Sequence, residues 1–198
     1  MKIAVISYNE VNTNPVLLAL ENMGAHAFAT ELAEEITSAD KVIFPGAGEA
    51  SSAMAYLKTK KLDEVLLSLN QPVLGICLGM QLMCRQTEEG NTQGLGIFRV
   101  NVKKLPLPAG HAGTGPLHEG WDVIHDLKGP LFKEVPEQAK VYYVHSYYAE
   151  LDAYTSAVTD FSQTFSAGIS YENFHAVQFH PETSGVAGEF VFRNFLAL

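Results

Sequence analysis

The sequence predicts an α/β fold: a single domain with a central, mostly parallel sheet, helices on both faces and an antiparallel extension. Its first half alternates short, continuously apolar segments with helical patterns, and such strands belong to parallel sheets covered on both faces. Its second half has longer strands with more aromatic residues, separated by turns rich in Gly and Pro. We see no repeat, low-complexity run or linker, so we expect one domain over residues 1–198.

The elements of the first half follow one another as strand and helix. The predicted strands are "KIAVIS", "AHAFAT", "KVIFPG" and "PVLGI". Pro15 is placed to open a helix over "PVLLALENMG", a helical pattern runs from Glu49 to Asn70, and "LGMQLMCRQ" continues as a helix after the fourth strand. Ligands of parallel sheets bind at the carboxyl ends of the strands, which is where the segment Gly46–Gly48 and Cys77 fall.

The second half adds strands in "LGIFRVNVKKL", "VYYVHSYYAEL" and "ISYENFHAVQF". We expect antiparallel hairpins that extend the sheet, and then a closing helix in "GEFVFRNFLAL". No Lys or Arg occurs from Val141 to Phe192, so this stretch should form a neutral or acidic surface unless a partner supplies positive charge.

Net charge, cysteine content and the N-terminal residues limit which partners and which cellular compartment we expect. The net charge of −9 repels phosphate backbones and anionic headgroups, so we expect neither nucleic acid nor membrane as a partner. Cys77 and Cys84, if they share a helix, lie about 10 Å apart, which is too far for a disulfide and points to a reducing compartment. The apolar run of "MKIAVISYNE" is too short for a secretory signal, and we expect a cytoplasmic protein.

The pattern Gly75-x-Cys77-x-Gly79, between a buried strand and a helix, is typical of a nucleophile elbow with cysteine in place of serine. The turn is strained, and a larger side chain at either glycine would collide with its neighbours. The sulfur would lie at a helix N-terminus, which favours the thiolate, and the N–H of Leu78 would point toward an oxyanion. The five-residue pattern alone does not distinguish this from a core cysteine beside packing glycines.

A thiol nucleophile needs a base, and His180 in "FHPE" is the best candidate. Pro181 favours an extended backbone at His180, so Glu182 lies on the same side and can hold one imidazole nitrogen while the other faces the thiol. The alternative is a strand-end histidine with an exposed glutamate. With the elbow present, we favour a triad. His145 in "YVHSYY" has no acid two residues away and is better explained as a packed strand histidine.

Two other patterns predict no bound group. His111, His118 and His125 are evenly spaced, but Gly and Pro between them rule out one helix, so we expect neither a metal nor a cofactor. "PGAGEA" lacks the Lys-Ser/Thr of a phosphate loop and the third glycine of a dinucleotide fingerprint. The segment Gly46–Gly48, with Ala47 at its centre, suits a second oxyanion donor whose peptide could flip between donating and withholding its N–H.

Together these motifs resemble the class I glutamine amidotransferases, whose fold is flavodoxin-like, and within them the glutaminase subunits of imidazole glycerol phosphate synthases. The resemblance covers the whole chain and rests on "PGAGEA", "GICLGMQL", "YYVHSYY" and "QFHPETSG". It implies that Cys77 attacks the side-chain amide of glutamine, that His180, oriented by Glu182, protonates the leaving ammonia, and that water hydrolyses the glutamyl thioester. It also implies an oxyanion hole from Gly46, Ala47, Gly48 and Leu78, and glutamine contacts from Gln81 and the backbone around Ser146 and Tyr147.

The same resemblance implies a partner. Ammonia would pass to a (β/α)8-barrel cyclase subunit, bound as a heterodimer, which makes imidazole glycerol phosphate and an aminoimidazole carboxamide nucleotide in histidine biosynthesis. The chain departs from the usual pattern on the side implied for the cyclase, at Val11, Glu119, Asp122 and Thr183. Two alternatives therefore stay open: a paralogue that supplies another synthase, and a catalytically silent scaffold. A cysteine-elbow stress or peptidase-like protein fits least, since those lack His-Pro-Glu.

Overall fold

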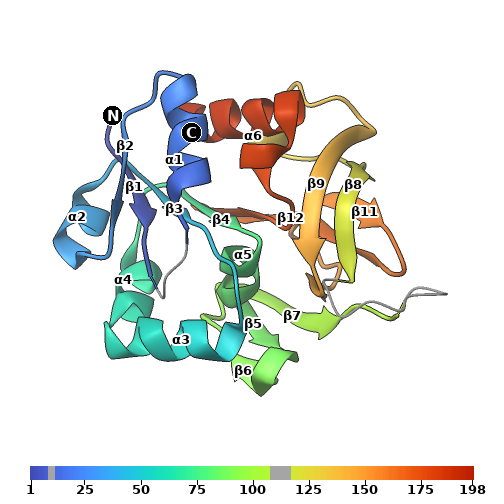
Figure 1. Ribbon diagram of the computed structural model, residues 1–198, viewed down its shortest axis with the longest axis horizontal. Coiled ribbons are helices and arrows are strands. Elements are labelled where there is room, and N and C mark those ends of the chain that lie inside the picture. Colours follow the sequence, from blue (N-terminus) through green and yellow to red (C-terminus); the bar gives the residue numbers. More distant parts are fainter. Residues whose placement is uncertain (9–11, 108–116) are drawn as a thin grey trace.

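The centre of the fold is a seven-stranded sheet in the order β11-β12-β13-β4-β3-β1-β2 (Figure 1). The computed structural model describes residues 1–8, 12–107 and 117–198. The strands from β2 to β13 in that order run parallel, and β12 and β11 continue the sheet antiparallel. Their bounds are β1 Ile3–Ile6, β2 Ala27–Thr30, β3 Lys41–Phe44, β4 Val73–Ile76, β11 Thr155–Asp160, β12 Thr164–Tyr171 and β13 Phe174–Val177.

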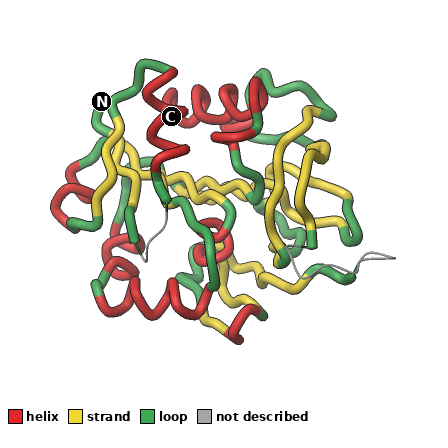
Figure 2. The backbone as a smooth tube through the Cα atoms, viewed as in Figure 1, coloured by secondary structure: helices red, strands yellow, loops and turns green. Residues whose placement is uncertain are grey.

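Helices cover both faces of this sheet (Figure 2). The α-helices are α1 Asn14–Asn22, α2 Ala33–Ser38, α3 Ala50–Thr59, α4 Leu62–Ser68, α5 Leu78–Met83 and α6 Gly185–Ala197. Helices α1 and α6 lie on one side and α3 to α5 on the other (Figure 1). Alternate residues of a strand point to opposite faces, so Ile3 and Val5 join the core under α1 and α6, whereas Ala4 and Ile6 join the core under the other helices. The predicted fold class is confirmed.

The second half builds more than an extension of the central sheet. Strands β5 Cys84–Thr87, β6 Thr92–Gln93, β7 Phe98–Lys104 and β10 Tyr147–Ala149 form a separate sheet, and β8 His118–Ile124 pairs with β9 Ala139–His145. The segment "VYYVHSYYAEL" therefore splits at Ser146 between two sheets. The segment "ISYENFHAVQF" is the end of β12, a turn at Glu172 with φ +54°, and β13. Long-range pairing decides these breaks, which local pattern does not show.

Two predicted helices were too long. The pattern over Glu49–Asn70 breaks at Lys61, which has φ +57° and separates α3 from α4. Helix α5 ends at Met83 because Cys84 turns to extended backbone and pairs with Phe98 as the start of β5. The premise that Cys77 and Cys84 share a helix is therefore wrong, although both cysteines are free.

Three neighbouring parallel strands end at one edge of the sheet, and this edge positions the site. In register, Phe44 of β3 lies opposite Gly75 of β4, and Ile76 of β4 lies opposite Val177 of β13. The residues that follow these strands are therefore brought together, as expected for the carboxyl edge of a parallel sheet. Across the described ranges, the helices are all too short or too polar to span a bilayer.

Candidate active site

Cys77 follows β4 on a strained turn. It has φ +53° and ψ −110°, and its N–H donates to Val177 O at 2.9 Å. A Cβ atom at Gly79 would lie 1.9 Å from the carbonyl oxygen of Phe44, which only glycine avoids because backbone cannot move aside. A Cβ atom at Gly75 would lie 2.5 Å from Met83 Sδ. The elbow therefore requires glycine at Gly79, whereas at Gly75 a larger side chain would first displace the flexible end of Met83.

His180 and Glu182 reach the same point from the end of β13. His180 Nδ1 lies 2.8 Å from Glu182 Oε1, and the His180 side chain also hydrogen-bonds that of Cys77. Burial lowers the pKa of His180, but the charges and hydrogen bonds of Cys77 and Glu182 outweigh it and raise the pKa to about 10. His180 therefore contacts both of the other predicted triad residues, Cys77 on one side and Glu182 on the other, and its raised pKa favours the protonated imidazole beside the sulfur at neutral pH.

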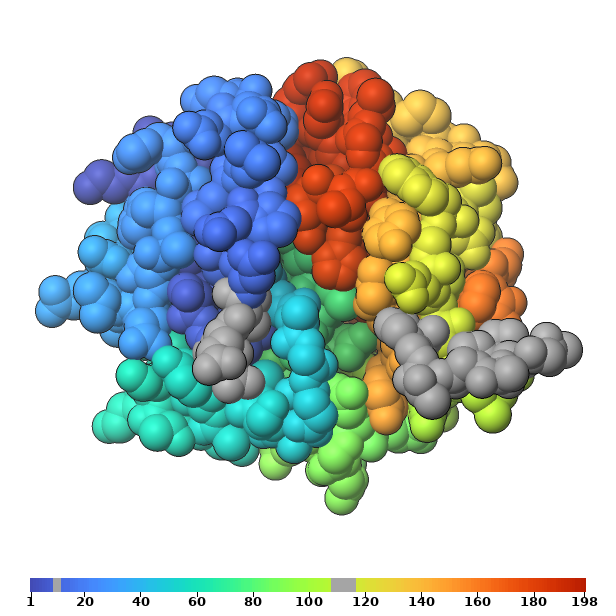
Figure 3. All heavy atoms as spheres, viewed as in Figure 1, coloured from blue at the N-terminus to red at the C-terminus, as the bar shows by residue number. Residues whose placement is uncertain are grey.

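These groups open into a pocket of about 440 Å³, a size that suits a small ligand. Figure 3 shows the hollow near the centre of the face, where the green atoms of the elbow region lie deeper than the cyan segment after β3. The pocket is lined by Ala47, Gly48, Cys77, Leu78, Gln81, Glu89, Tyr142, Val144, His145, Ser146, Tyr147, His180 and Thr183. Among the predicted site residues, Gly46 and Glu182 are not part of this lining.

The segment after β3 packs directly against the elbow. A Cβ atom at Gly46 would lie 2.7 Å from Gly79 N and 2.8 Å from Leu78 Cβ, so the approach of the two backbones requires glycine. Gly48 has φ +96°, a conformation that glycine adopts without strain. The buried Tyr8 hydroxyl lies beside Gly46 and has no hydrogen-bond partner within the described part of the chain.

Gln81 lies on α5, and two hydrogen bonds hold its side-chain amide in place. Its Nε2 donates to Tyr147 O at 2.8 Å and to Gln178 Oε1 at 3.0 Å. Both amide hydrogens are therefore used, and the carbonyl oxygen of Gln81 is the atom left for a ligand. Ser146 Oγ accepts a hydrogen bond from Leu117 N at 3.1 Å, so this hydroxyl helps to fix the pocket wall that includes Tyr147.

His145 lines the pocket as well, but its contacts are those of a packed residue. Its Nδ1 donates to Tyr147 O at 2.8 Å, and its Nε2 lies 3.1 Å from His118 Nδ1. Burial lowers the pKa of His145 to about 3 and that of His118 to about 4. His118 Nε2 in turn lies 3.5 Å from Asp122 Oδ2. His145 stays neutral at neutral pH, in agreement with the packed interpretation.

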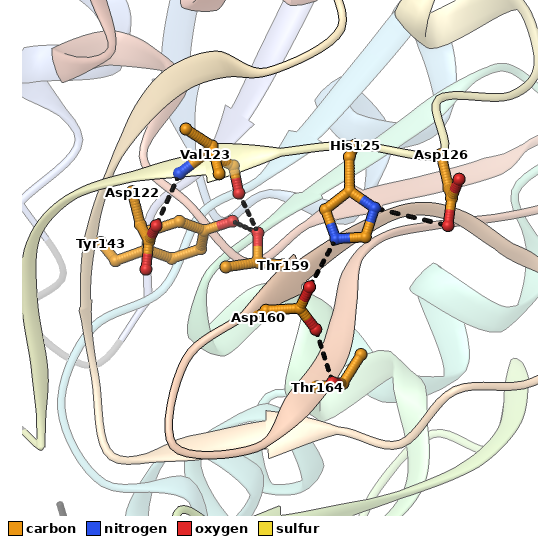
Figure 4. A network of polar contacts seen from close by, with 8 residues as sticks. All are labelled: Asp122, Val123, His125, Asp126, Tyr143, Thr159, Asp160 and Thr164. Carbon is orange, nitrogen blue, oxygen red and sulfur yellow. Dashed lines mark hydrogen bonds and ion pairs between the residues drawn. The ribbon is translucent and has the colours of Figure 1, made fainter.

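The evenly spaced histidines that the structure describes have different contacts and do not form one site. His111 lies outside the described residues, and His118 is bound to His145. His125 Nε2 contacts Asp160 Oδ2 at 3.0 Å and its Nδ1 lies 3.4 Å from Asp126 Oδ2 (Figure 4). The network in Figure 4 ties β8 to β11, and none of its residues lines the pocket. Within the described ranges no group of His, Cys, Asp and Glu is arranged to hold a metal.

Two groups were not singled out from the sequence: Glu89, which lines the pocket, and Gln178, which does not line it but contacts the thiol. Glu89 lies on the 3₁₀ turn η1, Glu89–Asn91, where its Oε2 accepts from Ala50 N at 2.9 Å and burial raises its pKa. Gln178 is fully buried and its Nε2 lies 3.7 Å from Cys77 Sγ. Gln178 stands two residues before His180, so the alternation of an extended chain was a signal for it. For Glu89 we find no comparable signal.

The departures from the family pattern lie at the surface where they are described. Glu119 is exposed on β8, Asp122 is half-buried on the same strand, and Thr183 is exposed at the pocket. Val11 lies outside the described residues. None of the three described positions takes part in the contacts that His180 makes with the side chains of Cys77 and Glu182.

Comparisons with known proteins show the family and the fold. The model of the family "Glutamine amidotransferase class-I" matches residues 17–198, so the chain belongs to that family. A solved structure titled as a glutamine amidotransferase has a TM-score of 0.70 at 15% identity, covering 98% of this chain and 97% of that chain, which shows the shared fold.

The relatives at higher identity share one protein name. The Bacteroides fragilis protein "Imidazole glycerol phosphate synthase subunit HisH" is 50% identical over 198 residues, covering 100% of each chain. The protein of the same name from Pasteurella multocida is 43% identical and covers 98% of this chain and 96% of its own length. Within the class I glutamine amidotransferases, the chain therefore belongs with the HisH proteins.

Proposed function

We propose that this chain is the glutaminase subunit of an imidazole glycerol phosphate synthase, with residues 1–198 forming one glutaminase domain. The observation that carries the proposal is the meeting, at one pocket, of a thiol on a strained elbow and a histidine held at 2.8 Å by a carboxylate. The full-length identity of 50% to a HisH protein supports the particular synthase.

The reaction follows from these groups. Cys77 attacks the side-chain amide carbon of glutamine, a C–S bond forms, and the carbonyl oxygen takes the negative charge. The N–H of Leu78 and a peptide N–H of Gly46–Gly48 stabilise that oxyanion. His180 gives its proton to the nitrogen of the substrate amide as the C–N bond breaks and ammonia leaves. It then takes a proton from the water that attacks the thioester, the C–S bond breaks, glutamate is released, and the Cys77 thiolate is restored beside the protonated imidazole.

Glutamine recognition uses the wall opposite the triad. The free carbonyl oxygen of Gln81 accepts from the α-ammonium group, and the Glu89 carboxylate supplies the matching charge. The backbone at Ser146 and Tyr147 holds the rest of the substrate. This assignment requires Glu89 to be ionised, which a bound ammonium group favours over the raised pKa that burial gives the empty site.

The ammonia acceptor is a (β/α)8-barrel cyclase, bound as a heterodimer. An uncovered apolar surface is a candidate for that interface: Trp121 is 56% exposed, Val186 is 68% exposed, and both border one groove. Glu119 and Thr183 are exposed nearby in sequence, so a cyclase that fits this chain should place positive or polar groups against them.

The test is glutamate release from glutamine by the protein alone, then with the barrel cyclase of the same organism and its nucleotide substrate. We expect a large rise in the complete mixture and none with Cys77→Ala, which should fold and bind the cyclase normally. No rise, with Cys77 still labelled by a glutamine-like electrophile, would favour a different synthase. Failure of both release and labelling would favour the silent scaffold.

A further inference from the structure

A chain of buried amides connects the thiol to the glutamine-binding wall. Gln178, fully buried, follows β13, and its Nε2 lies 3.7 Å from Cys77 Sγ. Its Oε1 accepts from Gln81 Nε2 at 3.0 Å, and the same nitrogen of Gln81 donates to Tyr147 O at 2.8 Å. The three hydrogen bonds run without interruption from the backbone of β10 to the sulfur.

The direction of this chain is fixed at its far end. The Tyr147 carbonyl has no hydrogen, so Gln81 must present its amide NH₂ there. The second hydrogen of that NH₂ meets Gln178, which must therefore present its oxygen to Gln81. The NH₂ of Gln178 is then the only end of that amide that remains, and it points toward the sulfur of Cys77. Reversing Gln178 would set two NH₂ groups against each other.

The backbone holds both side chains at this separation. Cys77 N donates to Val177 O at 2.9 Å, and Gln178 N donates to Ala167 O at 2.9 Å. The Gln178 amide is buried, where a polar group without a partner is costly, so the contact with the sulfur also satisfies the amide. The donor is thus built into the sheet edge and needs no ligand to form.

We propose that Gln178 is a positioning residue of the glutaminase reaction: its amide N–H donates to the Cys77 sulfur and favours the thiolate. The proposal deepens the function argued above and rests on it. His180 surrenders its proton to ammonia during the reaction, whereas a neutral amide donates before and after that step. Gln178 therefore supports the sulfur while the charge of His180 changes, and Gln81 couples that support to the wall that binds glutamine.

The experiment follows the thiol rather than turnover. In the complex with the cyclase, the rate of Cys77 alkylation by iodoacetamide is measured from pH 5 to 10, with the labelled peptide identified by mass. Gln178→Glu keeps the shape and accepts from Gln81, but it turns an oxygen toward the sulfur. We expect the half-maximal pH to move up by about one unit, so that alkylation at a pH below both midpoints falls about tenfold. Gln178→Met, which lacks the N–H donor, should raise the half-maximal pH of alkylation as well, but by less.

The control is Gln163→Glu, the same change at an exposed glutamine, which should leave the profile unchanged. If the Gln178 variants do not fold, Gln81→Met breaks the chain one step away and should still raise the half-maximal pH. A profile equal to the wild type in folded Gln178→Glu and Gln178→Met would overturn the proposal. Because alkylation needs no glutamine, this failure is distinguishable from loss of the glutaminase assignment, which glutamate release tests.

Discussion

His180 and His145 line the same pocket, and their surroundings give them opposite protonation. His180 lies between a sulfur and a carboxylate, which raise its pKa to about 10. His145 lies between a carbonyl and another imidazole, and burial lowers its pKa to about 3. Burial acts against the charged form in both, so the neighbouring acidic groups decide the outcome. A proton donor therefore forms on one side of the pocket and a fixed neutral hydrogen-bond donor on the other.

The two sides also differ in how completely their polar atoms are paired. Both nitrogens of His145 have partners, and the chain continues through His118 toward Asp122. On the side of His180, Glu182 Oε2 and the Tyr8 hydroxyl are buried without a partner in the described structure. Unpaired buried groups lower stability, and a catalytic role is one reason for which they are retained. The His145 side is built for rigidity and the His180 side for reaction.

The largest expected effect comes from substituting the two histidines separately and comparing the losses of activity. His180→Asn should lower glutamate release by about 10²- to 10⁴-fold, because it removes the proton carrier. His145→Asn should lower release by about tenfold or less, because asparagine can still donate to Tyr147 O. Steady-state glutamate release in the complete mixture measures both, with circular dichroism as the check on folding. Equal losses in two folded variants would mean that His145 also carries a proton.

Acid stability should distinguish the same two histidines. His145 and His118 have native pKa values of about 3 and about 4, below the unfolded value of 6.5. The unfolded chain therefore binds more protons than the native state between these pKa values, and the free energy of unfolding falls as pH drops below 6.5. The slope is about 1.4 kcal/mol per pH unit for each histidine. His180, whose native pKa is raised, contributes stability that is complete below 6.5 and is lost as pH rises toward about 10.

Urea unfolding at pH 7.0, 6.0 and 5.0 measures this slope. The comparison is His145→Gln, which removes one of the buried imidazoles with a lowered pKa and should make the loss between pH 7.0 and 5.0 smaller. His26→Gln, at a histidine outside the pocket, serves as the control and should keep the wild-type slope. An identical slope in His145→Gln would show that other groups, such as carboxylates, govern acid unfolding.

Features of the site that depend on residues close together in the sequence could be predicted from it. Features that depend on contacts between residues far apart in the sequence could not. The elbow and the His180–Glu182 contact depend on residues two apart, so both could be predicted. Gln178 acquires its role from Gln81, 97 positions earlier, and no local pattern shows that hydrogen bond. Likewise the break at Ser146 exists because β9 pairs with β8 while β10 pairs with β7.

A smaller effect tests the unpaired hydroxyl near the reactive side. Tyr8→Phe removes a buried oxygen that has no partner in the described structure, and it should raise the free energy of unfolding by about 1 kcal/mol. Thermal unfolding of the two proteins at pH 7 measures the difference. A loss of stability would mean that the hydroxyl is paired in solution, and the contrast between the two sides of the pocket would then weaken.

The smallest effect is expected at Cys84, the second thiol of the chain. It is fully buried at the start of β5, its Sγ lies 3.4 Å from Met80 O, and burial raises its pKa, so it stays a thiol. Cys84→Ser replaces that thiol with a hydroxyl that can donate to the same carbonyl, so glutamate release should stay within about twofold of wild type. A large loss in a folded variant would show that the end of α5 shapes the elbow at its start. Near-normal release would confine the chemistry to Cys77 and provide a one-cysteine protein in which its alkylation can be followed directly.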